Sequence, residues 1–199
     1  NENSYIRYVD QMVFELVCKM IQESIQKGMK MVPISFNLSK ASFEDEPFMQ
    51  EYMEVFQQFD IPKEYIEFEL LESISMDNSD KLIKVVDTIH KAGFRCALDD
   101  FGSGYSSMSV LARVPIDIIK LDRSLFQNPY RDIDNFLIVD GLLDILHHFP
   151  VQIVAEGVED ETVAEHMRQH GCDMIQGFYY YRPMPMDEFQ RLIAEQGEC

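Results

Sequence analysis

The chain has 199 residues, of which 46% are hydrophobic, so it can bury a sizeable core and is not expected to be disordered. Its formal net charge of −18 argues against binding to polymeric nucleic acid and against docking on anionic membranes. No signal peptide or apolar run of membrane-spanning length is visible and the 4 cysteines lack metal-site spacing, so we expect reduced thiols, a cytoplasmic location and no membrane insertion by this domain.

The first predicted element is a helix over 5–28, because apolar residues recur there at helical spacing. Its predicted buried face consists of Val9, Met12, Val13, Leu16, Val17, Met20 and Ile21. The chain then predicts a strand over 31–39, a helix over 47–59, a strand over 65–73 and a helix over 79–93. The later elements are predicted strands over 94–100 and 116–122, a helix over 132–149, a strand over 151–159, a helix over 160–171, a strand over 172–181 and a helix over 186–196. This alternation predicts parallel strands with crossover helices.

Each predicted strand carries a polar residue near its C-terminal end, and these residues are Asn37, Glu69, Asp99, Lys120, Glu156 and Gln176. An open sheet concentrates its chemistry where the strand order reverses, whereas a (β/α)8 barrel gathers residues from the ends of many strands. The series therefore favours a TIM-like α/β barrel. Because such barrels usually have eight strands and roughly 250 residues, we expect about two strands to precede residue 1. Residues 1–199 are then a single, N-terminally incomplete domain.

Asp99 and Asp100 end an apolar stretch and are followed by glycine and serine. One aspartate in this place is compatible with a turn or a helix cap. Two adjacent carboxylates repel each other unless a cation lies between them. The other oxygen donors of the series are Asn37, Glu69 and Glu156. Hard oxygen donors indicate Mg²⁺ or Mn²⁺, and a pair of such ions suits phosphoryl transfer, with Lys120 available to orient a water or to stabilise developing charge.

Short motifs occur along the chain in the order NLS (37–39), ELLE (69–72), DDFGSGYSS (99–107), KLD (120–122), AEGVE (155–159) and QGFYYYRP (176–183). From about Ser4 to Gln190, the chain closely resembles the EAL-domain phosphodiesterases of bacterial cyclic-di-GMP signalling. The resemblance implies metal-dependent hydrolysis of one phosphodiester of cyclic-di-GMP to give linear pGpG. It also implies a TIM-like barrel of the EAL type in which an early strand runs antiparallel.

The resemblance assigns roles to individual residues. In the family, the ligands of one metal match Asn37, Glu69 and Asp99. The residues of the second metal site, some acting through water, match Asp99, Asp100 and Glu156.

Three further positions match residues with other roles in the family. Lys120 matches the lysine beside the hydrolytic water, and Gln176 matches a residue that lines the site. Glu72 matches the acid that steadies the loop over 101–107. The family further implies a homodimer that pairs near this loop, and fused upstream signalling domains are expected.

The chain departs from the family pattern at Leu71, where the family usually has threonine, and at Leu121, where it has isoleucine. The Glu-Ala-Leu motif, whose glutamate is a metal ligand, lies upstream of the matching region. We therefore expect residues 1–199 alone to show little hydrolysis. Two alternatives remain open: a degenerate, non-catalytic EAL domain that acts as a cyclic-di-GMP receptor or protein-interaction module, and a metal-dependent barrel hydrolase for another phosphodiester.

Overall fold

The computed structural model describes residues 2–44, 48–71, 79–103, 111–126 and 136–196. The chain forms two compact units, each described by itself below. Unit 1 consists of residues 1–70, 87–95 and 183–199, and unit 2 consists of residues 71–86 and 96–182. The helix α5 (Ser79–Lys91) and the strand β3 (Arg95–Phe101) contribute residues to both units. None of the helices in these described ranges has both the length and the apolar character needed to cross a bilayer.

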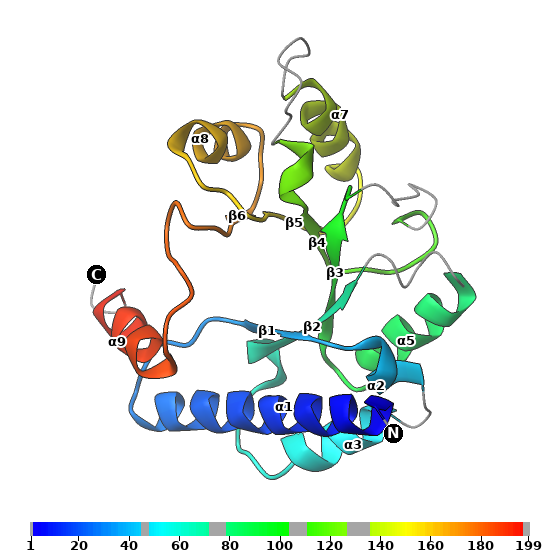
Figure 1. Cartoon of the computed structure of the whole chain (residues 1–199), viewed down its shortest axis with the longest axis vertical. Helices are drawn as coiled ribbons and strands as arrows, with labels where there is room; N and C mark the ends of the chain where they lie inside the picture. The colour runs from blue at the N-terminus through cyan, green and yellow to red at the C-terminus, as the bar shows by residue number, and fades with distance from the viewer. Residues whose placement is uncertain (1, 45–47, 72–78, 104–110, 127–135, 197–199) are drawn as a thin grey trace. The chain divides into compact units, whose positions relative to one another are not determined.

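Unit 1 is built on two parallel strands, β1 (Ile34–Asn37) and β2 (Ile66–Leu71). Its other elements are α1 (Glu2–Gln26), α2 (Lys40–Glu44), α3 (Phe48–Phe56), the short 3-10 helix η1 (Lys63–Tyr65) and α9 (Met186–Gln196). The long helix α1 packs against α2 and α3 (Figure 1). The side-chain amide of Gln190 donates a hydrogen bond of 3.0 Å to the hydroxyl of Ser24, which ties α9 to α1.

An aromatic cluster forms the core of unit 1, and its rings are those of Phe14, Phe36, Tyr52 and Phe68, with centroids 5.0 to 5.9 Å apart. This cluster corrects the predicted buried face of α1. Met12, Val13 and Leu16 are 41 to 51% exposed, whereas Phe14 is fully buried. The buried residues of α1 are Phe14, Cys18, Met20, Ile21 and Ser24, so the prediction is confirmed for Met20 and Ile21. These residues have the same helical spacing as the predicted stripe, so periodicity alone could not choose between the two sets.

Unit 2 is a four-stranded parallel arrangement of β3, β4 (Ile118–Leu121), β5 (Gln152–Ala155) and β6 (Met174–Ile175), paired in chain order. Its helices include α7 (Leu137–Leu146), α8 (Glu161–Gln169) and the short 3-10 helix η2 (Arg123–Leu125). α7 and α8 lie on the same side of the strands (Figure 1). Ala97, Ile118 and Val154, from three successive strands, form a buried apolar cluster at the centre of the unit.

Two aspartates hold the starts of these strands in the same way. Asp117 immediately precedes β4, and its Oδ2 accepts a 2.7 Å hydrogen bond from the backbone N–H of Cys96 in β3. Asp173 immediately precedes β6, and its Oδ2 accepts a 2.7 Å hydrogen bond from the backbone N–H of Ile153 in β5. Each carboxylate therefore pairs with the second residue of the preceding strand, at the N-terminal end of that strand.

The described residues confirm the predicted order of strands and helices. Two strands in unit 1 and four in unit 2 pair in parallel within their unit. The predicted strand over 172–181 is wrong in extent, because only Met174–Ile175 pair with a neighbour. After this pair the backbone turns, and the N–H groups of Tyr180 and Tyr181 both donate to the carbonyl of Gly177. Aromatic residues favour strands, but the tyrosines here are exposed and satisfy their backbone in a turn instead.

Candidate active site

A β-bulge brings two adjacent aspartates to the C-terminal end of β3. The register between β3 and β4 shifts between Leu98 and Phe101. As a result, Asp99 and Asp100 stand opposite the single residue Lys120 of β4. Asp100 has a φ of 58°, in the left-handed region that residues with a side chain rarely adopt. Neighbouring side chains of a regular strand point to opposite faces, so the bulge is what allows both carboxylates to serve one site.

The two aspartates converge with Glu156, which follows directly after β5. One carboxylate oxygen from each of Asp99, Asp100 and Glu156 lies within 4.8 Å of the others. The backbone N–H of Glu156 donates a 3.0 Å hydrogen bond to the carbonyl of Leu121, which fixes the position of the residue beside β4. The strands β3 and β5 of unit 2 therefore supply the acidic cluster, on either side of β4.

Lys120 is the cation of this cluster and is almost fully buried, with 6% of its surface exposed. Its Nζ lies 2.5 Å from Oε1 of Glu156 and 3.4 Å from Oδ1 of Asp99. With three ionised carboxylates the cluster of four side chains carries a formal charge of −2, since Lys120 balances only one of them. Carboxylates this close together repel each other, so the arrangement favours an additional cation.

The environment of Glu156 opposes its ionisation. The pKa of Glu156 is raised to about 7: burial is the main cause, the hydrogen bond and the charge of Lys120 act in the opposite direction, and the charge of Asp99 adds to the rise. A divalent cation beside the carboxylates would favour their ionised forms. The oxygen donors of Asp99, Asp100 and Glu156 fit a hard divalent cation such as Mg²⁺ or Mn²⁺.

In unit 1, two further predicted residues lie beside each other at the ends of β1 and β2. Asn37 and Glu69 are register partners, and the carbonyl of Glu69 accepts a 2.9 Å hydrogen bond from the backbone N–H of Leu38. Glu69 is buried, with 4% of its surface exposed, whereas Asn37 is exposed. The two residues are thus neighbours in the backbone of unit 1, and their role as metal ligands stays a prediction.

Gln176 follows directly after β6 and bonds through its backbone to the segment around Glu156. Its N–H donates 2.8 Å to the carbonyl of Ala155, and its carbonyl accepts 3.2 Å from the N–H of Val158. The side chain of Gln176 is exposed, and its role in lining the site stays a prediction. Glu72 lies outside the described residues, as does the predicted loop beyond Ser103.

The bulge is the feature of the site that sequence reasoning missed. Sequence reasoning also did not predict that Lys120 contacts both Asp99 and Glu156 directly. The adjacent acids were a signal for the bulge, because two neighbours in one regular strand cannot face the same site. The following Gly102, with a φ of 94°, belongs to the same change of direction.

Comparison with known proteins gives this cluster a family context. The family model described as "EAL domain" matches residues 1–183 of the chain. The chain belongs to the EAL-domain family. It is 29% identical over 195 residues to the signaling protein YkoW of Bacillus subtilis (strain 168), covering 98% of this chain and 24% of that protein. It is 30% identical over 175 residues to the cyclic di-GMP phosphodiesterase PdeR of Escherichia coli (strain K12), covering 88% of this chain and 26% of that protein. The chain therefore spans about a quarter of the length of these relatives.

Solved structures of EAL proteins show the same fold. The PaMucR phosphodiesterase in complex with c-di-GMP is 27% identical to the chain and aligns with a TM-score of 0.86, covering 94% of this chain and 76% of that one. The EAL domain of Mycobacterium smegmatis DcpA is 28% identical with a TM-score of 0.82, covering 93% of this chain and 83% of that one. The predicted fold class, the TIM-like α/β fold of EAL domains, is confirmed by these matches.

Proposed function

We propose that this chain carries the catalytic residues of a divalent-metal-dependent phosphodiesterase that hydrolyses cyclic-di-GMP to linear pGpG. The observation that carries the proposal is the cluster of Asp99, Asp100 and Glu156 within unit 2, in which Lys120 contacts Asp99 and Glu156. Relatives named cyclic di-GMP phosphodiesterases support the choice of substrate. In the reaction, a water oxygen bonds to phosphorus, the bond to one ribose 3′ oxygen breaks, and a proton passes to that oxygen.

Each residue of the cluster has a role in this proposal. Bound Mg²⁺ or Mn²⁺ would activate water and neutralise phosphate charge. As the family resemblance implies, Asn37, Glu69 and Asp99 would be ligands of one cation, and Asp99, Asp100 and Glu156 would belong to the site of a second.

Two further residues act on the water and the substrate. Lys120 is held at a fixed position by two acids, from which its ammonium group would orient the attacking water. Gln176 would contact the nucleotide.

The proposal extends to features that the family resemblance implies. We include a homodimer that pairs near the loop over 101–107, with Glu72 close to its interface. We also include further signalling domains in the parent protein. The assignment of residues 1–199 to a single EAL-type barrel domain belongs to the proposal as well. The chain spans about a quarter of its curated relatives, which leaves room for such domains.

The experiment is chromatographic separation of cyclic-di-GMP from pGpG with Mg²⁺, Mn²⁺ or EDTA present. It uses the chain as it stands and the chain together with any residues that its gene encodes upstream. We expect pGpG to form only with a divalent cation and chiefly from the longer protein. Lys120→Met should lower turnover by about 100-fold or more, as expected for a group acting on the nucleophile.

The matched control is Lys91→Met, because Lys91 forms an exposed ion pair with Asp87. This variant should turn over like the unmodified protein. If the longer protein binds cyclic-di-GMP with metal present and releases no pGpG, the catalytic proposal fails and the receptor alternative replaces it. Release of product from another phosphodiester alone would favour the third alternative.

A further inference from the structure

Two histidines on α8 and its C-terminal cap form a cluster that is distinct from the acidic cluster around Lys120. His166 and His170 are four residues apart, so both side chains lie on the same face of the helix. Their rings stack with centroids 4.0 Å apart, and Phe136 stacks on the other face of His166 at 3.6 Å. This stack restricts the orientation of the His166 ring, which is mostly buried.

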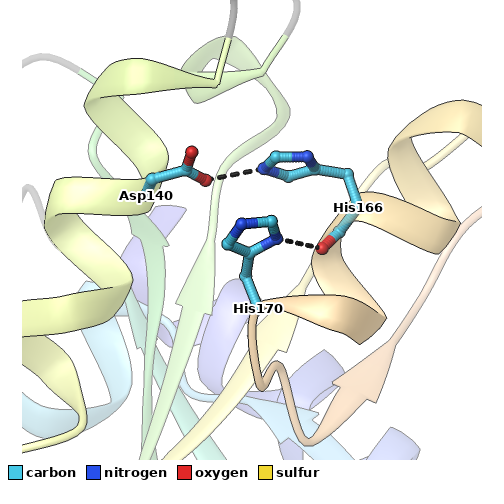
Figure 2. Close-up of side chains that lie close together, drawn as sticks. All are labelled: Asp140, His166 and His170. Atoms are coloured by element: carbon cyan, nitrogen blue, oxygen red, sulfur yellow. Dashed lines mark hydrogen bonds and ion pairs between the residues drawn. The ribbon is translucent and has the colours of Figure 1, made fainter.

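A carboxylate from the neighbouring helix completes the cluster. Oδ1 of Asp140 in α7 lies 2.6 Å from Nε2 of His166 (Figure 2). One possible ligand atom from each of Asp140, His166 and His170 lies within 4.8 Å of the others. In the tetrahedral geometry that zinc prefers, two ligand atoms with bonds of about 2.1 Å to the ion are about 3.4 Å apart. Small side-chain rotations therefore bring the three atoms to coordination distance.

The hydrogen bonding of His170 prepares it to be a ligand. Its Nδ1 lies 2.8 Å from the backbone carbonyl of His166 (Figure 2). Because a carbonyl only accepts, Nδ1 carries the proton and donates, and in the neutral ring the lone pair is then on Nε2. Histidines that bind metals typically donate their other ring N–H to a carbonyl or a carboxylate in this manner. The contact is therefore the one that a metal-binding histidine would need.

We propose that Asp140, His166 and His170 bind one transition-metal ion, with Zn²⁺ as the representative ion. Two imidazoles and one carboxylate suit zinc, cobalt or nickel and differ from the all-oxygen donors preferred by Mg²⁺. The net charge of −18 favours accumulation of any cation near the surface. The site is separate from the proposed phosphodiesterase chemistry, because neither histidine belongs to that cluster.

The ion would link the two helices that flank β5. α7 precedes this strand and α8 follows it, and Asp140 and His166 are 26 residues apart in the chain. Coordination would replace the single hydrogen-bonded contact by bonds from both helices to one centre. Since Glu156 follows β5 directly, the site would stabilise the segment that positions this acid, through the helices and without contact to the substrate.

The test is Zn²⁺ titration by calorimetry on the chain, with excess Mg²⁺ present to occupy the carboxylate site. We expect one Zn²⁺ to bind per chain. His170→Ala should weaken the affinity for Zn²⁺ by at least about 100-fold, because removing even a group that only hydrogen-bonds to a metal ligand costs about 10- to 100-fold. His170 is exposed, so this variant should fold even if His166→Ala does not. Co²⁺ titration followed by visible absorption reports the coordination geometry independently.

His90→Ala is the matched control, because His90 lies near the C-terminal end of α5 and outside this cluster. It should bind Zn²⁺ like the unmodified chain. Equal affinity of the unmodified chain and His170→Ala would overturn the proposal. Loss of the bound ion in Asp99→Asn, with full binding in His170→Ala, would overturn it as well and would assign the ion to the acidic cluster.

Discussion

The left-handed backbone at Asp100 predicts an unusual order of stability among substitutions at this position. A residue with a side chain costs about 1–2 kcal/mol in the left-handed region, and glycine avoids this cost. Glycine also loses more conformational freedom on folding, by about 0.4–1 kcal/mol relative to alanine. At the φ of 58° of Asp100, the first effect exceeds the second. Asp100→Gly should therefore be more stable than Asp100→Ala by about 0.5–1 kcal/mol.

Both variants lose the carboxylate, so their difference isolates the backbone. The measurement is thermal unfolding in EDTA, where a difference of 1 kcal/mol corresponds to about 2–4 °C in Tm for a chain of this size. Ser35 in β1 provides the matched control, because it is a strand residue without a positive φ. There the order should reverse, and Ser35→Ala should be the more stable of its pair. If alanine is also the more stable residue at position 100, the bulge does not hold Asp100 as described.

Three further predictions concern the cluster and the turn beside it. Lys120→Met should destabilise the metal-free chain by about 3–5 kcal/mol, because it leaves buried carboxylates without their cation. Denaturant unfolding in EDTA measures this loss, and an unchanged midpoint would contradict the prediction. Mg²⁺ should raise the stability of the unmodified chain by about 2.7 kcal/mol at a concentration 100 times its Kd. In thermal scans, Asp99→Asn should lose most of this gain. An equal gain in the variant and the unmodified chain would exclude Asp99 as a ligand. Gly102→Ala should destabilise the chain by more than about 1 kcal/mol, since Gly102 has a φ of 94° and an added Cβ would lie 2.5 Å from Cδ1 of Leu125. Gly141→Ala is the control in the same denaturant unfolding assay, because a Cβ added at Gly141 meets open space.

The sequence predicted the order of the elements and the residues at the strand ends because both depend on local patterns. Period-two and period-3.6 spacing placed β3 to β5 and α8 within a few residues. The polar residue at each strand end interrupts an apolar run, so Lys120 and Glu156 could be identified without any tertiary contact. Their proximity followed from the rule that parallel strands end at the same edge of a sheet.

The remaining features depend on contacts between distant parts of the chain. The bulge at Asp99 and Asp100 is a property of the register between two strands, and local sequence does not fix that register. The buried face of α1 was misjudged because Phe14 meets rings from other elements. The cluster of Asp140 with His166 was missed for the same reason, although the spacing of His166 and His170 was a visible signal.

The paired aspartates at the starts of the strands separate two kinds of sensitivity within unit 2. Asp117 and Asp173 protect the amides of Cys96 and Ile153 at the end of the strands away from Lys120. In amide hydrogen exchange these two N–H groups should report opening of the strand starts, independently of events at the acidic cluster. A selection for altered chemistry could thus vary the C-terminal ends of the strands while these bonds keep the other ends closed. Random substitution of Asp117 or Asp173 would instead lower the amount of folded protein, and the variants that still fold would keep their specificity.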